Sequence, residues 1–185
     1  MKKTFASVDD FISFLTIEYE NSKQNLCLIL SGTPGSGKSF ITSKILEQVY
    51  GVTNPKKYGS YICSADNYFV DETTGVYTFD KNKLGQAHKE CKIKFFNSIC
   101  DVSPVVIVDN TNVTPFDCNF YYDLADIRNF KPFIVRVVPG TLKEAQARNV
   151  HNVPEHACEK MAKPFAEFVK GAPWWWNILT VENKA

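Results

Sequence analysis

A glycine-rich segment carries the clearest chemistry in this sequence. It reads Gly32-Thr33-Pro34-Gly35-Ser36-Gly37-Lys38-Ser39 and matches the pattern G-x-x-x-x-G-K-[ST] of phosphate-binding loops. Glycines let successive main-chain amides point at phosphate oxygens, and the lysine can reach the β- and γ-phosphates of a nucleotide. The serine hydroxyl can ligate Mg²⁺. We therefore assign these residues, with the adjoining Phe40, to the binding of ATP and Mg²⁺.

Two carboxylates follow other predicted strands. Asp109 ends the β-branched run 104–108, where phosphate-loop proteins keep the acid that supports Mg²⁺, so we predict a metal site formed by Ser39 and Asp109. Asp66 follows a second short strand, residues 60–63. Transfer of a γ-phosphoryl group to an alcohol needs a carboxylate near the attacking hydroxyl. We predict that Asp66 is this general base; the alternative is a residue that only starts a turn.

Charge that develops on the transferred phosphoryl group needs a mobile cation, usually an arginine. Of the chain's three arginines, Arg136 lies within a strand and Arg128 ends a helix, where a cation offsets the helix dipole. Arg148 lies on a short helix before residues 149–154, a polar segment where a lid can hinge. We predict that Arg148 contacts the phosphates; the alternative is a solvated helix face.

The elements that position these residues alternate between strands and helices. Apolar runs 26–30, 60–63, 104–108 and 133–138, with a last edge strand at 177–181, predict five strands. Strands separated by helices form a mainly parallel sheet with helices on both faces, and its ligands collect at the carboxyl ends of the strands. The predicted fold is therefore a three-layer α/β sandwich, in which the loop, Asp66 and Asp109 share one rim.

The helical segments show apolar residues at helical spacing. Residues 8–19 predict a leading helix capped by Ser7, so we place a helical extension at 1–25 and a single domain at 26–185, with a lid near 141–156. Helix 81–100 is expected to bury a face that includes His88, and Trp174 to Trp176 are expected to pack under the sheet. The helix from 115 to 129 is expected to bury Phe116, Phe120, Leu124 and Ile127.

Composition narrows the function classes. The chain has 185 residues, 44% of them hydrophobic, and a formal net charge of +1, so no overall charge draws it to a long nucleic acid or an anionic membrane. The six cysteines form no C-x-x-C pair and are expected to be reduced and mostly buried. The start lacks the long apolar core of a signal peptide. We expect an intracellular protein of the cytoplasm or nucleus that does not bind membranes.

Several stretches together resemble the polynucleotide-kinase-like P-loop kinases. In family order they are LILSGTPGSGKS, SADNYF, GVYTFD, LGQAH, VIVDNTN, ARNVHNVP and EHACEKMAKPF. The resemblance implies a kinase-type P-loop NTPase fold with a five-stranded parallel sheet and a helical lid. It also implies Mg²⁺- and ATP-dependent phosphorylation of a 5′-hydroxyl, with Lys38 and Ser39 at the phosphates, Asp66 as general base and Arg148 as lid arginine. The phage enzymes carry an arginine three residues after the base; Phe69 stands there in this chain.

The expected function is thus a polynucleotide 5′-hydroxyl kinase, with the 5′ end of DNA or RNA as partner and nucleic-acid repair as a role. Two alternatives stay open: the same chemistry on a nucleoside or a modified base, and a non-catalytic ATP-dependent binding module. Asp66 argues against the second, because a binding switch needs no carboxylate on the acceptor side.

Overall fold

The computed structural model describes residues 1–54, 57, 59, 61–101, 103–149 and 153–184. The strands are β1 (Lys2–Phe5), β2 (Leu26–Ser31), β3 (Ile62–Cys63), β4 (Val105–Val108), β5 (Lys131–Pro139) and β6 (Ile178–Asn183). The α-helices are α1 (Val8–Asn21), α2 (Lys38–Lys44), α3 (Leu84–Cys100), α4 (Pro115–Ile127), α5 (Leu142–Ala147) and α6 (Glu155–Gly171). A π-helical turn, η1 (Ile45–Val49), continues α2, and 3₁₀ turns η3 (Ala65–Phe69) and η4 (Lys81–Lys83) precede α3.

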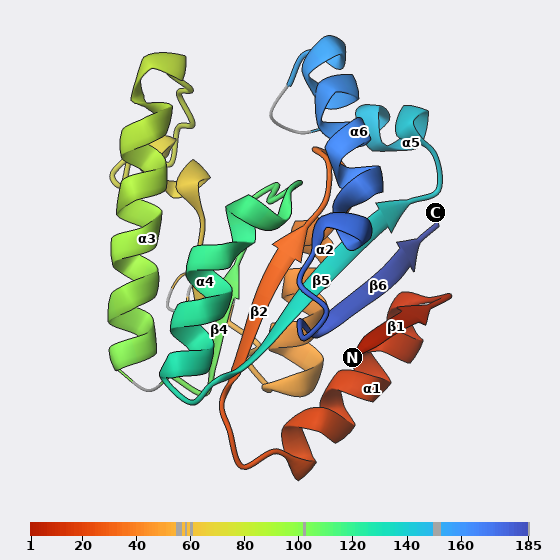
Figure 1. The fold of residues 1–185 in the computed structure, drawn as a ribbon. Helices are drawn as coiled ribbons and strands as arrows, with labels where there is room; N and C mark the ends of the chain where they lie inside the picture. Colours follow the sequence, from red (N-terminus) through yellow and green to blue (C-terminus); the bar gives the residue numbers. More distant parts are fainter. Residues whose placement is uncertain (55–56, 58, 60, 102, 150–152, 185) are drawn as a thin grey trace.

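The strands form one parallel sheet in the order β1-β6-β5-β2-β4-β3 within the described residues. Helices α3, α4 and α6 cover one face, and α1 and α2 cover the other (Figure 1). The predicted α/β class and parallel sheet are therefore confirmed. All these strands run in one direction, so β2, β3 and β4 end at a single rim.

The expected strand count was wrong, because the described part of the sheet has six strands and not five. The additional strand is β1, which lies in the segment that the sequence predicted as helical and pairs with β6 from Lys2↔Ile178 to Phe5↔Val181. Only Phe5 of this strand is buried. A four-residue strand with one buried side chain leaves too little alternation to be recognised from sequence. Consequently β6 lies inside the sheet rather than at its edge.

Helix α1 begins as predicted, with the Asp10 amide donating to the Ser7 hydroxyl oxygen at 3.1 Å. The expected faces of α3 and α4 were partly wrong. Helix α3 buries Ala87, Cys91, Phe95 and Ile99, which leaves His88 exposed. Helix α4 buries Cys118, Tyr121, Tyr122 and Ala125, while Phe116 is 84% and Ile127 78% exposed. Helix α4 has apolar residues on two sides, and periodicity alone does not say which side meets the sheet.

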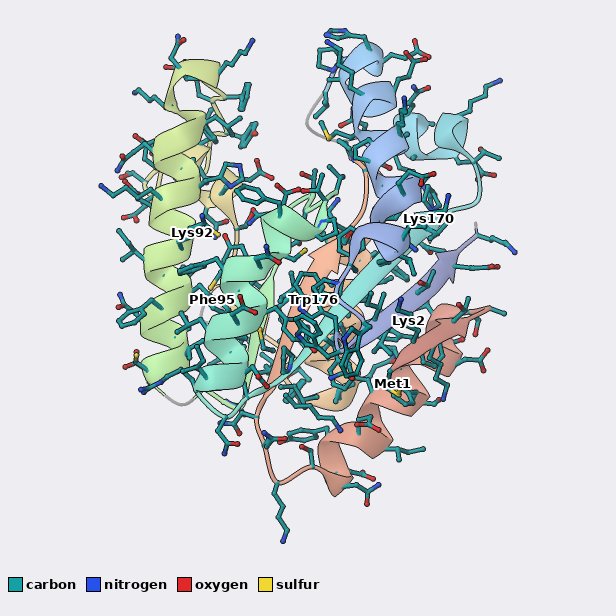
Figure 2. The ribbon with its side chains drawn as sticks, in the orientation of Figure 1. Met1, Lys2, Lys92, Phe95, Lys170 and Trp176 are labelled. Atoms are coloured by element: carbon teal, nitrogen blue, oxygen red, sulfur yellow. The ribbon has the colours of Figure 1, made fainter. Side chains whose placement is uncertain are left out.

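The three consecutive tryptophans divide between interior and surface. Trp176 is buried, as predicted, and Figure 2 shows its place in the molecule. Its ring stacks on that of Tyr122 of α4, with centroids 4.8 Å apart. Trp174 and Trp175 are exposed, so the prediction was wrong for them. The difference follows from the turn at residues 173–176, which directs only Trp176 toward α4.

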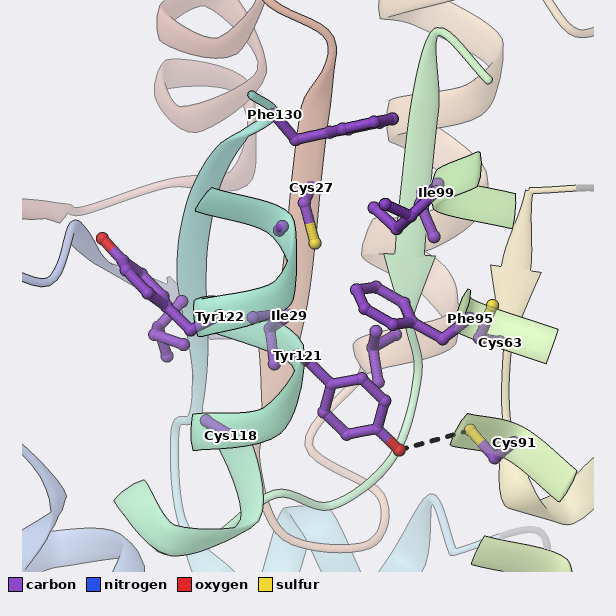
Figure 3. Packing of buried hydrophobic residues seen from close by; sticks show 14 of the residues in the cluster. Cys27, Ile29, Cys63, Cys91, Phe95, Ile99, Cys118, Tyr121, Tyr122 and Phe130 are labelled. Carbon is purple, nitrogen blue, oxygen red and sulfur yellow. Dashed lines mark hydrogen bonds between the residues drawn. The ribbon is translucent and has the colours of Figure 1, made fainter. Parts of the chain in front are cut away.

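The core lies on both faces of the sheet. One cluster joins β2, β4 and β5 to α3 and α4, and Figure 3 shows Cys27, Phe95 and Tyr121 packed within it. The Tyr121 hydroxyl contacts the Cys91 sulfur at 3.5 Å, which gives this buried phenol a polar partner. The six cysteines carry free thiols, and all but Cys100 are buried, as predicted. No described helix combines the length and apolar character needed to cross a bilayer.

Candidate active site

The glycine loop, residues 32–37, connects β2 to α2 at the carboxyl end of the sheet. The strand before it agrees with the predicted apolar run 26–30. The Gly32 amide donates to the Thr111 carbonyl at 2.8 Å, and the Ser36 amide donates to the Thr33 carbonyl at 3.1 Å. Helix α2 begins at Lys38, so the positive end of its dipole faces the loop.

At two positions of the loop, Gly35 and Gly37, the backbone and the surrounding space require glycine. Gly35 and Gly37 have φ angles of +73° and +97°, which L-residues rarely adopt. A Cβ on Gly35 would collide with the Ala145 carbonyl oxygen of α5, and one on Gly37 would collide with the Asn183 amide nitrogen at the end of β6. The loop is therefore in close contact with α5, in the predicted lid, on one side and with the end of β6 on the other.

The Lys38 ammonium turns back onto the loop. It donates to the carbonyl oxygens of Gly32 and Thr33, at 3.0 and 3.1 Å. Burial lowers the pKa of Lys38, and the negative charges of Asp109 and Asp66 partly offset that effect. The ammonium thus lies within electrostatic reach of both predicted carboxylates. Polyphosphate oxygens can replace the two carbonyl acceptors without moving the lysine out of the loop.

The predicted metal pair is together in the structure. The Ser39 hydroxyl donates to Asp109 Oδ2 at 3.3 Å, across the gap between α2 and the end of β4. A hydroxyl and a carboxylate are oxygen ligands of the kind Mg²⁺ takes, with waters and phosphates filling its other positions. Among the described residues no group of three or more His, Cys, Asp or Glu side chains is arranged for a metal ion. A site of this kind therefore depends on the nucleotide for part of its coordination.

Asp66 lies in η3, directly after β3, on the same rim. The Asp66 amide donates to the Ser64 hydroxyl at 3.2 Å, and the Ala65 amide donates to Asn110 Oδ1 at 2.9 Å. Asp66 Oδ1 accepts a hydrogen bond of 3.2 Å from the Tyr77 hydroxyl. The Asp66 carboxylate is therefore fixed through its main chain and through one oxygen.

The three residues after Asp109 hold the neighbouring loops in place. Asn110 is buried and contacts the Asp66 segment, as described above, and its amide nitrogen also donates to the Cys91 sulfur at 3.4 Å. Thr111 accepts from Gly32, and Asn112 donates to the Leu30 carbonyl at 2.8 Å. In the structure they tie the glycine loop, β2 and the Asp66 segment together.

Arg148 ends α5, the short helix that touches the glycine loop through Ala145. Its Nε donates to the Glu144 carbonyl at 3.3 Å, and its Nη2 is buried and forms no hydrogen bond within the described part of the chain. Arg148 thus lies at the end of the helix that contacts the glycine loop, and its lid role stays a prediction. Residues 150–152 of the polar segment that follows, like residue 60 of the second predicted strand, lie outside the described residues.

Several buried polar atoms of the glycine loop and of α5 lack a hydrogen-bond partner in the described part of the chain, which bears on whether a nucleotide fits this site. Thr33 Oγ1 and Ser36 Oγ of the loop, and Gln146 Nε2 of α5, have no hydrogen-bond partner among the described residues. Arg148 Nη2 adds a fourth such group. Buried polar groups nearly always have a partner, so these groups fit a site whose oxygen-rich ligand supplies one. Phe40, also assigned to the nucleotide, is 52% exposed just beyond the loop.

Arg136 anchors α6 to the sheet. This residue is 8% exposed, and its Nη2 donates to the Phe165 carbonyl of α6 at 2.8 Å. The guanidinium lies 4.5 Å from the Phe165 ring centroid and 5.7 Å from that of Phe168. Burial lowers its pKa, as expected for a cation removed from water. Arg136 therefore fixes α6 to β5, while Arg148 lies at the end of α5.

Sequence reasoning missed three side chains at this site: Tyr77, Gln146 and Asn183. Asn183 Nδ2 donates to the Ser36 carbonyl at 2.9 Å, although 147 positions separate the two residues. No local pattern marks Asn183, because its role depends on the order of strands in the sheet. Tyr77 belongs to the GVYTFD stretch that carries the family resemblance, so that stretch was its only signal.

Human NEDD4-binding protein 2 is among the sequence relatives of this chain. It is 32% identical over 151 residues, which cover 77% of this chain and 8% of the human protein. The chain thus matches only a small part of that relative's length. No family model matches the chain.

Solved structures with the same fold include a proposed kinase from Chloroflexus aurantiacus. Its TM-score is 0.55 at 15% identity, and the match covers 86% of this chain and 89% of that one. The AvrRxo1-ORF1–ORF2 complex with ATP gives a TM-score of 0.51 at 16% identity, over 80% of this chain and 48% of the other. Both likenesses show that the chain shares the α/β fold of these proteins.

Proposed function

We propose that this chain is an ATP- and Mg²⁺-dependent phosphotransferase that acts on a hydroxyl group. One observation carries the proposal: the Lys38 ammonium, held against the loop by the Gly32 and Thr33 carbonyls, lies within electrostatic reach of both Asp66 and the Asp109 carboxylate that pairs with Ser39. A phosphate site, a metal pair and an acceptor-side base on one rim are the parts that phosphoryl transfer requires. The fold it shares with a proposed kinase and with an ATP complex supports the same reaction class.

The residues then have distinct tasks. The amides of the glycine loop, with Lys38 and the hydroxyls of Thr33 and Ser36, hold the β- and γ-phosphates of ATP. Ser39 and Asp109 hold Mg²⁺, which when bound neutralises charge on the phosphate oxygens. The unpaired Nη2 of Arg148 turns from the lid toward the equatorial oxygens of the transferred group.

Asp66 prepares the acceptor. Its carboxylate accepts a hydrogen bond from the attacking hydroxyl and takes the proton as the bond between oxygen and the γ-phosphorus forms. The bond from the γ-phosphorus to the β–γ bridging oxygen breaks, and ADP leaves with that electron pair. The products are ADP, the phosphorylated acceptor and one proton, which passes from Asp66 to solvent.

The acceptor that the motif resemblance favours is the 5′-hydroxyl end of DNA or RNA. The local charge supports it: lysines 81, 83, 89, 92 and 94 follow the Asp66 loop on η4 and α3. Two of them have partners in the protein, because Lys94 donates to the Gly59 carbonyl at 2.8 Å and Lys92 lies over the Phe120 ring. A few lysines can guide a few phosphates without a high net charge.

A nucleoside or a modified base within nucleic acid is a second candidate acceptor. Phe69 favours it, because this residue stands where the phage enzymes carry an arginine, and it is 6% exposed. A buried phenylalanine cannot hold a phosphate of the acceptor. The two candidates differ in how many acceptor phosphates the site contacts.

The test is an acceptor panel. Wild-type protein, γ-labelled ATP and Mg²⁺ are incubated with 5′-hydroxyl DNA, 5′-hydroxyl RNA, nucleosides and no acceptor, and labelled products are resolved. We expect label on the 5′ end of an oligonucleotide. Label on nucleosides alone would identify the second candidate. Tight ATP binding with no labelled acceptor would instead identify a binding module and overturn the proposal.

A further inference from the structure

The segment that follows Asp66 folds back over it as a hairpin. We call residues 69–78 the Tyr77 hairpin. Val70 and Tyr77 form an antiparallel bridge, the Asp71 amide donates to the Val76 carbonyl at 3.0 Å, and the Thr78 amide donates to the Phe69 carbonyl at 2.8 Å. The hairpin thus brings Tyr77 back into contact with Asp66, which lies 11 positions earlier in the chain.

The turn of this hairpin is internally fixed. Asp71 Oδ1 accepts from the amides of Thr73 and Thr74, at 3.0 and 2.7 Å, and from the Thr74 hydroxyl at 2.9 Å. The bond from the Thr74 amide is the main cause of the lowered pKa of Asp71. Gly75, with φ +71°, closes the turn, and its amide donates to the Asp71 carbonyl at 2.8 Å. A turn held in this way fixes the register that delivers Tyr77.

Aromatic packing fixes the tyrosine ring. The buried Phe69 ring lies 6.1 Å from Tyr77, 5.1 Å from Phe79 and 5.3 Å from Tyr68, measured between centroids. Edge-to-face and tilted pairs of this kind restrict ring orientation. Phe69 therefore supports the hairpin from beneath instead of contacting an acceptor.

The Tyr77 hydroxyl donates to Asp66 Oδ1 at 3.2 Å. Partial burial, together with the charge of Asp66 and this hydrogen bond, raises the pKa of Tyr77 to about 12, so the phenol remains a donor at neutral pH. No other donor contacts the Asp66 carboxylate within the described residues. One carboxylate oxygen is thus occupied, and Oδ2 is left for an incoming hydroxyl.

We propose that Tyr77 is a positioning residue, which holds the Asp66 carboxylate in the orientation that presents Oδ2 to the acceptor hydroxyl. This proposal rests on the proposed function, in which Asp66 is the general base. Tyr77 does not itself touch the reacting atoms. Its ring packs on Phe69, and its hydroxyl selects one rotamer of Asp66. A base held in one rotamer meets the acceptor without a search among orientations.

The experiment separates the hydroxyl from the ring. Tyr77→Phe keeps the packing and removes only the donor, and Tyr68→Phe is the matched control from the same aromatic cluster. We expect Tyr77→Phe to lower kcat about tenfold, within the range seen when an orienting partner is removed, with unchanged ATP affinity. Tyr68→Phe should keep the wild-type kcat. In an Asp66→Asn background, Tyr77→Phe should change the rate by less than about twofold, because the base is already absent.

Two results would overturn the proposal: a wild-type kcat for Tyr77→Phe, or an equal loss of rate in both backgrounds, which would mark a structural effect. A second measurement does not depend on activity. In protein labelled with ¹³C-aspartate, Tyr77→Phe should move the carboxyl resonance of Asp66, and Tyr68→Phe should not. An unmoved resonance overturns the contact itself. If wild-type protein transfers no phosphate, the proposed function fails, and the positioning role fails with it even where the resonance moves.

Discussion

Asn183, at the end of the last strand, donates its side-chain amide to the main-chain carbonyl of Ser36 in the glycine loop, at 2.9 Å. The same amide nitrogen occupies the space that a Cβ on Gly37 would need. Asn183 is only 8% exposed. The conformation of the glycine loop therefore depends on a contact made by the far end of the chain.

Asn183→Asp should weaken ATP binding about tenfold, which corresponds to about 1.4 kcal/mol. The substitution keeps the shape of the side chain, removes the donor and adds a negative charge beside the proposed phosphate site. Titration calorimetry with Mg²⁺ and a non-hydrolysable ATP analogue measures the change. Asn21→Asp is the control, because Asn21 also donates to a main-chain carbonyl, at 2.9 Å, but at the end of α1. An affinity within twofold of wild type for Asn183→Asp would contradict this role.

The local motifs were predictable because each consists of residues that are adjacent in the sequence. The strand, loop and helix around Lys38 follow from an apolar run, three glycines and a helical segment. Asp66 and Asp109 were placed on one rim because parallel strands share the direction of their carboxyl ends. The structure brings both within electrostatic reach of Lys38. Arg148 was assigned to a lid because its short helix precedes the polar segment 149–154, and that role stays a prediction.

What the sequence did not reveal depends on contacts between distant segments. Strand β1 forms because it pairs with the edge of β6. Its four residues are too few to show the alternation of apolar and polar residues that marks a strand. Helix α4 has two apolar sides, and the side with Tyr121 and Tyr122 is buried because their hydroxyls find partners in Cys91 and Asn177. Asn183 and Tyr77 act through contacts that only the folded chain creates.

The thiols should differ sharply in reactivity. Burial raises the pKa of Cys63 to about 11, and it also raises those of Cys27, Cys118 and Cys158. The reactive thiolate is therefore scarce at these positions at pH 8. Cys100, at the end of α3, is the partly exposed cysteine. Iodoacetamide should thus label the folded protein at Cys100 at least about tenfold faster than elsewhere.

Mass spectrometry of the labelled peptides measures these rates, with Cys100→Ser as the control that should remain unlabelled at pH 8.

The raised pKa of Cys63 also sets a pH dependence of stability. The folded state keeps its proton where the unfolded thiol, with a pKa of about 8.5, loses it. The contribution of Cys63 to stability is complete below that value and is lost as the pH rises toward about 11. Rapid labelling of several thiols in the folded protein at pH 8 would contradict this account.

The acceptor affinity should depend weakly on salt. Each phosphate contact contributes a little under one unit to the slope of log affinity against log salt, so a few contacts give a total of about two or three. Lys89 is exposed on α3, and Lys92 lies 5.2 Å from the Phe120 ring, on the side of α3 that faces α4 (Figure 2). The double variant Lys89→Ala, Lys92→Ala should lower the slope by about one to two units.

Fluorescence anisotropy with a 5′-hydroxyl oligonucleotide measures this slope. Lys23→Ala is the control, because Lys23 is exposed before β2, at the opposite end of the strand from the glycine loop. A slope of zero for the wild type would indicate an uncharged acceptor. If the double variant leaves the slope unchanged, neither lysine contacts the acceptor and both belong to the solvated surface of α3.

The most direct test of the central claim is the rate at which labelled γ-phosphate passes from ATP to a 5′-hydroxyl oligonucleotide, compared among wild type, Lys38→Ala and Asp66→Asn. We predict that the wild type labels the acceptor and that Lys38→Ala does not, because the loop loses the cation that faces the phosphates. Asp66→Asn should keep the wild-type ATP affinity and lose at least about a hundredfold in rate. Transfer by Lys38→Ala within about threefold of wild type, or an unchanged rate for Asp66→Asn, would contradict the account.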